Sequence, residues 1–159
     1  MAKKRVTLPK NFDELTTAGD IEALKAVYDK CELTAHDSRY SLNTALHFGG
    51  VPDELVIWLV EQGLDVNTPD YYGRTPLYTH ATLGRDTVKL LYELGGDIQK
   101  PDTYGSTPLH TAAGFFRPKI VSFLIEKGAD VHAKNVMGRT PLAEALATCR
   151  QINIAQTAE

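Results

Sequence analysis

Histidine and cysteine, which act as metal ligands, general bases or nucleophiles, are few in this chain, with five histidines and two cysteines among 159 residues. Their chemistry depends on recurrent spacings such as HExxH, CxxC, GxSxG, GxGxxG or GxxxxGKS/T, and none of these occurs. His36, His80 and His132 stand far apart without ligand spacing. The sequence therefore predicts no catalytic residue, no metal site and no cofactor.

The other two histidines, His47 and His110, belong to a repeated phrase. Its copies are residues 42–50 (LNTALHFGG), 73–81 (GRTPLYTHA), 105–113 (GSTPLHTAA) and 138–146 (GRTPLAEAL). Tyr78 and Ala143 occupy the histidine position in two of the copies. A catalytic or metal-binding position would not accept these side chains, so both histidines are predicted to be structural.

The copies recur at a nearly constant interval. They open at spacings of 31, 32 and 33 residues, at Thr44, Thr75, Thr107 and Thr140. A glycine stands 12 residues before each of the last three, at Gly63, Gly95 and Gly128. The connector thus has a fixed length while the helical part varies, which is the reverse of ordinary loops and indicates a structured connector. Asp65, Asp97 and Asp130 recur with the same period and are assigned to this connector.

A period near 33 with the phrase TPLHxA resembles the ankyrin repeat, over about residues 11–156. The resemblance implies an all-α solenoid of about five stacked helix-turn-helix units joined by short β-hairpin-like loops. In that family the imidazole at positions such as His47 and His110 hydrogen-bonds to backbone between neighbouring repeats. Partners in the family usually meet the hairpin tips and the concave face of the first helix.

We expect residues 1–10 to be a disordered basic tail and residues 11–159 to be one ankyrin-repeat domain. Its units are an N-terminal cap repeat (11–36), three repeats (37–69, 70–101 and 102–134) and a partial last repeat (135–159). In the last unit Cys149 replaces the usual turn glycine, and a second helix is expected to begin near Ile152. No polar cap is evident there, which favours a truncated array or an end covered by a partner.

Each unit has local signals for its elements. Thr75, Thr107 and Thr140 are predicted helix N-caps, and the following prolines suit the first helical position. The first helix is expected to run about eight residues. Glycine is expected to end the second helix, and the segments 70–73 and 102–105 (Asp-x-x-Gly) are expected to form tight turns.

The amino-acid composition limits the classes of partner and the location that we expect for this protein. The chain has a net charge of −3, but the residues after position 10 carry 13 basic and 20 acidic side chains, which disfavours nucleic-acid binding. No apolar run of 18 residues occurs, so no membrane span is expected. Cys31 and Cys149 lie near opposite ends of the predicted stack and should not pair, which fits a cytoplasmic location. We expect a monomer.

Partner-binding residues are expected at positions that the repeat leaves free to vary. At the hairpin tips, tyrosine and arginine are the residues that dominate binding hot spots. The predicted set is Tyr71, Tyr72, Arg74, Thr103, Tyr104, Ser106, Met137 and Arg139 at the tips, with Phe115 and Phe116 at the end of a first helix. Tyr40 and Ser41 occupy the corresponding tip in the second unit. Packing between adjacent hairpins, or of one phenylalanine against a neighbouring helix, would explain the aromatics equally well.

The function expected is a non-catalytic module that binds a protein partner through its hairpin tips and concave helix face. One alternative is a regulatory or targeting domain cut from a longer multi-domain protein, which the unfinished last unit favours. Another is a small enzyme with a site in the concave groove, against which the dispersal of His, Asp and Cys argues.

Overall fold

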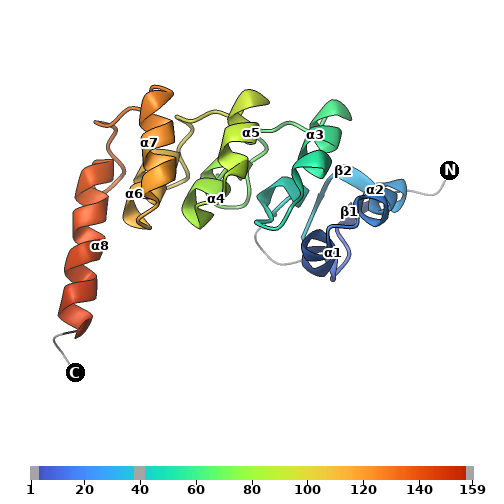
Figure 1. Cartoon of the computed structure of the whole chain (residues 1–159), viewed down its shortest axis with the longest axis horizontal. Helices are drawn as coiled ribbons and strands as arrows, with labels where there is room; N and C mark the ends of the chain where they lie inside the picture. Colours follow the sequence, from blue (N-terminus) through green and yellow to red (C-terminus); the bar gives the residue numbers. More distant parts are fainter. Residues whose placement is uncertain (1–3, 38–41, 157–159) are drawn as a thin grey trace.

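The computed structural model describes residues 4–37 and 42–156. Helix pairs follow one another in a row along the molecule, from α1 and α2 at one end to α8 at the other (Figure 1). The helices are α1 (Phe12–Ala18), α2 (Ile21–Lys30), α3 (Asp53–Glu61), α4 (Pro76–Leu83), α5 (Thr87–Glu93), α6 (Pro108–Gly114), α7 (Pro118–Glu126) and α8 (Pro141–Gln156), with a 3-10 turn at Ala45–His47. The predicted helical solenoid is confirmed, while the number of repeats stays a prediction.

The predicted local signals start the helices of the repeats. The Thr75 hydroxyl accepts a hydrogen bond from the Tyr78 N–H (3.2 Å), and the Thr140 hydroxyl accepts one from the Ala143 N–H (3.3 Å). Proline follows each threonine and opens α4 and α8, where no backbone partner is lost. The first helices α4 and α6 are eight and seven residues long, close to the expected eight.

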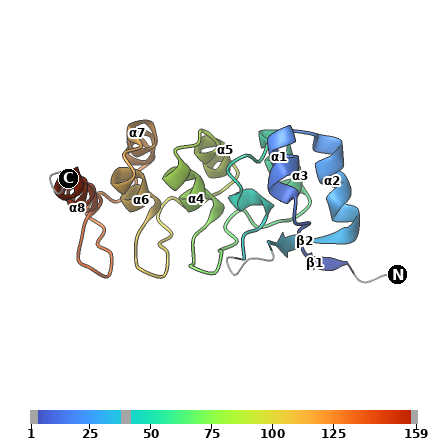
Figure 2. The same cartoon turned by 90° about the horizontal axis from the view of Figure 1, so that it is seen from below.

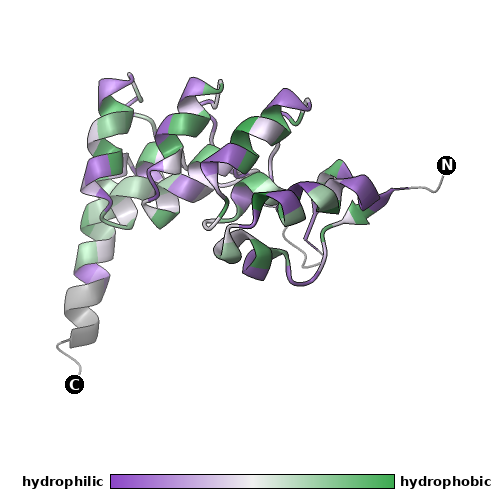
Figure 3. Cartoon of the chain, turned by 45° about the vertical axis from the view of Figure 1, so that its right-hand side comes forward, coloured by the Kyte–Doolittle hydropathy of each residue, from purple (hydrophilic) through white to green (hydrophobic). Residues whose placement is uncertain are grey.

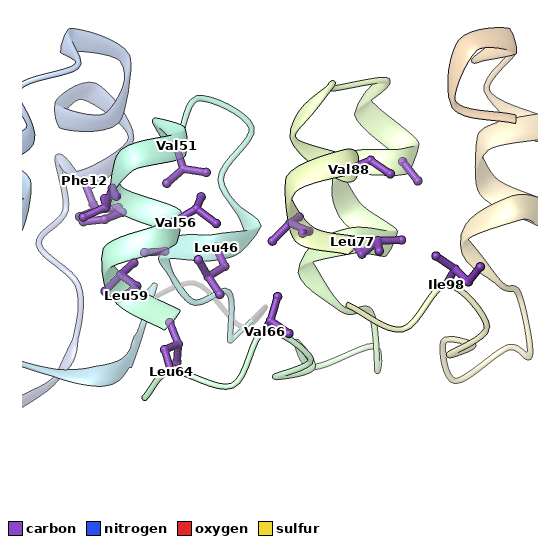
Figure 4. Close-up of a cluster of buried hydrophobic side chains, with 14 of the residues drawn as sticks. Phe12, Leu46, Val51, Val56, Leu59, Leu64, Val66, Leu77, Val88 and Ile98 are labelled. Atoms are coloured by element: carbon purple, nitrogen blue, oxygen red, sulfur yellow. The ribbon is translucent and has the colours of Figure 1, made fainter. Parts of the chain in front are cut away.

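Packing between neighbouring units forms one continuous core along the row. Figure 4 shows apolar side chains from successive units meeting between the helices, among them Leu46, Val56, Leu77 and Val88. Each helix of the row carries both apolar and polar segments, as expected for elements covered on one side only (Figure 3). The buried apolar side chains of the described residues form one cluster that spans the units, so the stability of each unit depends on its neighbours.

The ends of the second helices are tied together by side-chain amides. The Asn67 amide donates to the Gly95 carbonyl (3.0 Å) and accepts from the Asp97 N–H (2.8 Å). One unit later, Gln99 makes the same two contacts, to the Gly128 carbonyl (2.9 Å) and from the Asp130 N–H (3.2 Å). These amides satisfy backbone groups that the helix ends leave free.

The connectors form hairpins that project from the same side of the row (Figure 2). Backbone hydrogen bonds join one hairpin to the next, from the Thr103 N–H to the Tyr72 carbonyl and from the Val136 N–H to the Tyr104 carbonyl, both 2.9 Å. Gly73 has a φ of +76°, and a Cβ there would stand 3.3 Å from the Thr103 nitrogen. Glycine thus serves both the turn and the close approach of the next hairpin.

The N-terminal segment corrects two expectations. Strand β1 (Arg5–Thr7) pairs in parallel with β2 (Cys31–His36), so residues 4–10 are not a disordered tail and the fold is not purely α-helical. Leu8 is buried in the core, and its N–H donates to the His36 carbonyl (2.8 Å). This apolar anchor orders the segment and joins it to the unit of α1 and α2, a helix pair within the residues 11–36 that we predicted as the cap repeat. Residues 1–3 lie outside the described residues.

Two units differ from the expected helix pair. In residues 37–69 the first helix is only the three-residue 3-10 turn, because Gly49 and Gly50 follow one residue after it. In residues 135–159 no second helix begins near Ile152, since α8 is one helix of 16 residues. Cys149 and Arg150 stand where Gly84 and Arg85 end α4, and neither residue breaks a helix.

His80 is fully buried where α4 meets the preceding unit. Its Nε2 lies 3.0 Å from the Leu46 carbonyl, to which it donates, while its Nδ1 has no hydrogen-bond partner. Burial lowers the pKa of His80 to about 4, against an ordinary value of 6.5. A protonated imidazole therefore favours the unfolded chain, and the neutral ring is part of the folded state.

We predict that this histidine makes the fold acid-sensitive. Between pH 6.5 and about pH 4 the unfolded chain binds a proton that folded His80 excludes, so its contribution to stability is full above pH 6.5 and is lost as the pH falls. The loss should be on the order of 3 kcal/mol. Urea unfolding across this range should show a steeper fall for the natural chain than for His80→Ala. The exposed His132→Ala should keep the natural slope, and parallel curves for all three would contradict the prediction.

Candidate partner-binding surface

The tips of three hairpins form a row of exposed side chains. Tyr71, Tyr72, Thr103, Tyr104 and Met137 are all exposed. The backbone bonds from Thr103 to Tyr72 and from Val136 to Tyr104 hold these tips side by side. The structure thus brings the predicted tip residues together, and we call this set, with Arg74, Ser106 and Arg139, the hairpin-tip row.

A buried carboxylate orders the first of these tips. Asp70 Oδ1 accepts from the backbone N–H groups of Tyr72 (2.8 Å) and Arg74 (2.9 Å), while Oδ2 accepts from the Arg74 guanidinium at 2.7 and 2.6 Å. The Arg74 guanidinium also lies 4.9 Å from the centre of the Tyr72 ring, which packs edge-on against Tyr71 with the ring centres 5.3 Å apart. Arg74 is therefore half-buried and holds the two tyrosines in place.

The next two hairpins repeat this arrangement. Asp102 Oδ1 accepts from the N–H groups of Tyr104 and Ser106, both at 2.9 Å. Asn135 does the same for Met137 (3.0 Å) and Arg139 (3.1 Å). The neutral Asn135 side chain shows that the turn needs the acceptor oxygen and not the charge.

Tyr78 connects two of the hairpins through a helix. Its hydroxyl donates to Asp102 Oδ2 at 3.0 Å, so the side chain that replaces histidine in this copy reaches the following turn. Burial raises the pKa of the Tyr78 hydroxyl, and the nearby Asp102 carboxylate raises it further. The phenol therefore stays protonated and acts as a donor at neutral pH.

The structural interpretation of His47 and His110 is confirmed. In each, Nδ1 accepts from a backbone N–H at 3.1 Å, from Thr44 and Thr107 respectively. The proton therefore resides on Nε2, which donates to the carbonyl of Arg74 (3.0 Å) or Arg139 (2.9 Å) in the next hairpin. Both rings are buried, and each fixes one hairpin to the helix before it. Among residues 4–37 and 42–156, no three His, Cys, Asp or Glu side chains gather as metal ligands.

Phe115 and Phe116 lie apart from the hairpin-tip row, at the far end of α6. A helix of seven residues separates the two ends by about 10 Å. Both rings are exposed. They border a groove of about 490 Å³ between α6 and α8, which Ser106 also lines at its hairpin end. The predicted residues therefore form two patches, one at the hairpin tips and one at the far end of α6.

Phe116 has a backbone conformation that glycine normally occupies. Its φ is +55°, and its N–H bonds to the Ala113 carbonyl as Gly84 bonds to the Ala81 carbonyl at the end of α4. A left-handed conformation costs a residue with a side chain roughly 1–2 kcal/mol. An exposed aromatic held at this cost is a candidate for contact with a partner.

Sequence reasoning missed some features of this surface. The predicted set leaves out Val136, although this side chain is 71% exposed next to Met137. It also treated Arg74 and Arg139 as free anchors, whereas Asp70 and Glu144 already engage their guanidinium groups, Arg139 Nη1 lying 3.5 Å from the Glu144 carboxylate. The residues Tyr40 and Ser41 lie outside the described residues.

These features define a helical repeat protein with a preorganised surface of hairpin tips and first helices. The chain belongs to the ankyrin-repeat family, because the family described as ankyrin repeats (3 copies) matches residues 42–135 and 94–157. Comparison with curated proteins gave no match. In the described part of the chain, no helix has the length and apolar character needed to cross a membrane.

We predict that Phe116→Gly stabilises the fold. Removing the side chain relieves the left-handed strain, and part of the gain is offset by the greater freedom of glycine in the unfolded chain. The free energy of unfolding should rise by about 0.5–1 kcal/mol in urea titrations. Phe115→Gly is the matched control and should lower stability, because Phe115 has a negative φ. A Phe116→Gly chain less stable than the natural one would contradict this account.

Proposed function

We propose that this protein binds a protein partner through the hairpin-tip row and the adjoining surface of α4, α6 and α8. Ankyrin repeats are generally protein-protein interaction modules and are typically non-catalytic. The observation that supports this site is the row of exposed aromatic side chains on hairpins that are hydrogen-bonded to one another. Tyr71, Tyr72 and Tyr104 supply the apolar area of the contact.

The rigidity of the hairpins supports this proposal as much as the aromatic character of their exposed side chains does. Association costs free energy when loops or side chains must be ordered, and preorganisation lowers that cost. The tyrosine tips rest on backbone held by Asp70 and Asp102 and by the bonds between hairpins. Tyrosine itself has few rotatable bonds, so its large ring loses little entropy on binding.

Phe115 supports an extension of the contact along α6. Its ring is exposed beside the groove between α6 and α8, whose lining also includes Thr111, Glu144 and Thr148. A partner that reaches from the tips into this groove would bury both patches at once. We place the strongest contacts at the tips, where more aromatic side chains gather.

We predict that the triple variant Tyr71→Ala, Tyr72→Ala, Tyr104→Ala loses the partner while staying folded. Truncation of hot-spot tyrosines commonly costs 2 kcal/mol or more, so the affinity should fall by at least about thirtyfold. The immobilised chain would capture proteins from the lysate of its native cells, mass spectrometry would identify them, and calorimetry with the purified partner would measure the affinity.

Ile57→Ala is the matched control, because Ile57 is an exposed apolar residue of α3 away from the hairpins. This variant should bind the partner with natural affinity, and circular dichroism should show all variants folded. A purified partner bound equally by the natural chain and by the folded triple variant would refute the tip row as the site.

A further inference from the structure

The last two units expose positions that the units before them bury. Residues are equivalent when they stand at the same distance from the threonine that opens each phrase or the glycine that ends each second helix. Three series run from buried to accessible along the chain: Leu77 (0% exposed), Leu109 (2%) and Leu142 (69%); Val66 (6%), Ile98 (8%) and Val131 (41%); and Val56 (0%), Val88 (0%) and the half-buried Val121.

In the earlier units a second helix covers these positions. The contact between successive second helices is visible in the aromatic pairs Tyr28–Trp58 and Tyr92–Phe123, each with ring centres 5.8 Å apart. Ile125 stands at the position of Tyr92, three residues before the glycine that ends its helix, and it is 48% exposed. About half of the surface of the side chain that should meet the next second helix is therefore open to solvent.

These positions line one groove between α6, α7 and α8, with a volume of about 580 Å³. Its walls are almost entirely apolar and include Ala112, Val121 and Ile125 on one side and Pro141, Leu142 and Ala145 on the other. The groove continues the core of the stack, since Leu109 and Ala112 belong both to the core and to its floor.

We propose that this groove binds an amphipathic α-helix of a partner protein, which takes the place of the second helix of the last unit. This inference rests on the proposed function as a protein-binding module and adds a second, chemically defined contact to it. By the pattern of α7, the bound helix presents apolar side chains at the spacing of Ile120, Phe123 and Leu124. An aromatic residue at the Phe123 position would meet Ile125, as Phe123 meets Tyr92.

The course of α8 argues that the bound helix comes from another chain. Helix α4 ends at Leu83, whose equivalent in the last unit is Thr148, yet α8 continues for eight more residues to Gln156. At 1.5 Å per residue, this extension carries the helix about 12 Å past the level at which α4 ends. Figure 1 shows α8 running beyond the ends of the other helices. The end of α8 is therefore out of register with the groove that a second helix would fill.

The test uses a helix whose fit is known from the structure itself. The probe is a peptide of residues 116–128 (FRPKIVSFLIEKG), stapled between the positions of Ser122 and Glu126, both exposed in α7. Stapling is needed because so short a helix is marginal in water. Nuclear magnetic resonance would follow the Ile, Leu and Val methyl groups of the whole chain during titration. We expect saturable shifts at Val121, Ile125 and Leu142.

Two controls make the result specific. The same peptide with Leu124→Lys should leave the methyl resonances unchanged, because its apolar stripe is broken. On the protein, Leu142→Glu should weaken binding at least tenfold, whereas Val136→Glu should not, although the two residues are almost equally exposed at 69% and 71%. Shifts at other methyl groups, equal responses to both peptides, or no saturable shift would overturn the proposal.

Sedimentation of the chain alone tests whether a second copy of this chain, and not a partner helix, occupies the groove. A dimer that Leu142→Glu dissociates would assign the groove to a second copy and overturn the partner helix. The two experiments also distinguish a wrong assignment of the groove from a wrong assignment of the hairpin tips. If the peptide does not bind while the tyrosine triple variant still loses its captured partner, only this inference is removed. If the peptide binds and the triple variant keeps its partner, the tip site is removed instead.

Discussion

The shape of this molecule depends on a backbone hydrogen bond that recurs between successive hairpins. The Thr103 N–H donates to the Tyr72 carbonyl, and the Val136 N–H donates to the Tyr104 carbonyl. The buried imidazoles of His47 and His110 add a second connection, because each joins its own helix start to the carbonyl of the following hairpin. These contacts set the position of each unit relative to the next, and therefore where the exposed tyrosines stand.

The same arrangement explains why the two ends of the row differ. At the N-terminus, β1 and β2 and the buried Leu8 cover the end of the core. At the C-terminus, α8 lies beside α6 and leaves α7 without a neighbour on its outer side in the described part of the chain. A stack whose units bury one another's apolar faces leaves such a face uncovered wherever a unit lacks its second helix. The hairpin tips and this apolar groove are thus two consequences of one architecture.

Much of this could be predicted because repetition separates structural from variable residues. Thr75 and Thr140 as caps and His47 and His110 as structural imidazoles follow from residues that recur in register. The strand at Arg5–Thr7 could not be predicted, because its order depends on β2 and on burial of Leu8, which are contacts distant in sequence. The continuous α8 was missed because a helix was assumed to turn wherever its counterparts turn. The groove had a signal in the sequence, the alignment of Leu142 with Leu77 and Leu109, but exposure is visible only once the neighbouring helices are placed.

Whether the hairpins form one rigid surface is the central claim, and hydrogen exchange of backbone amides in the free protein tests it most directly. The amides of Thr103 and Val136 belong to loops by sequence, yet both are bonded to the preceding hairpin. Our account predicts that they exchange about as slowly as the amides within α4 and α6, through opening of the whole stack. Exchange at the rate of unprotected loop amides would show that the tips move independently, and would contradict a preorganised binding surface.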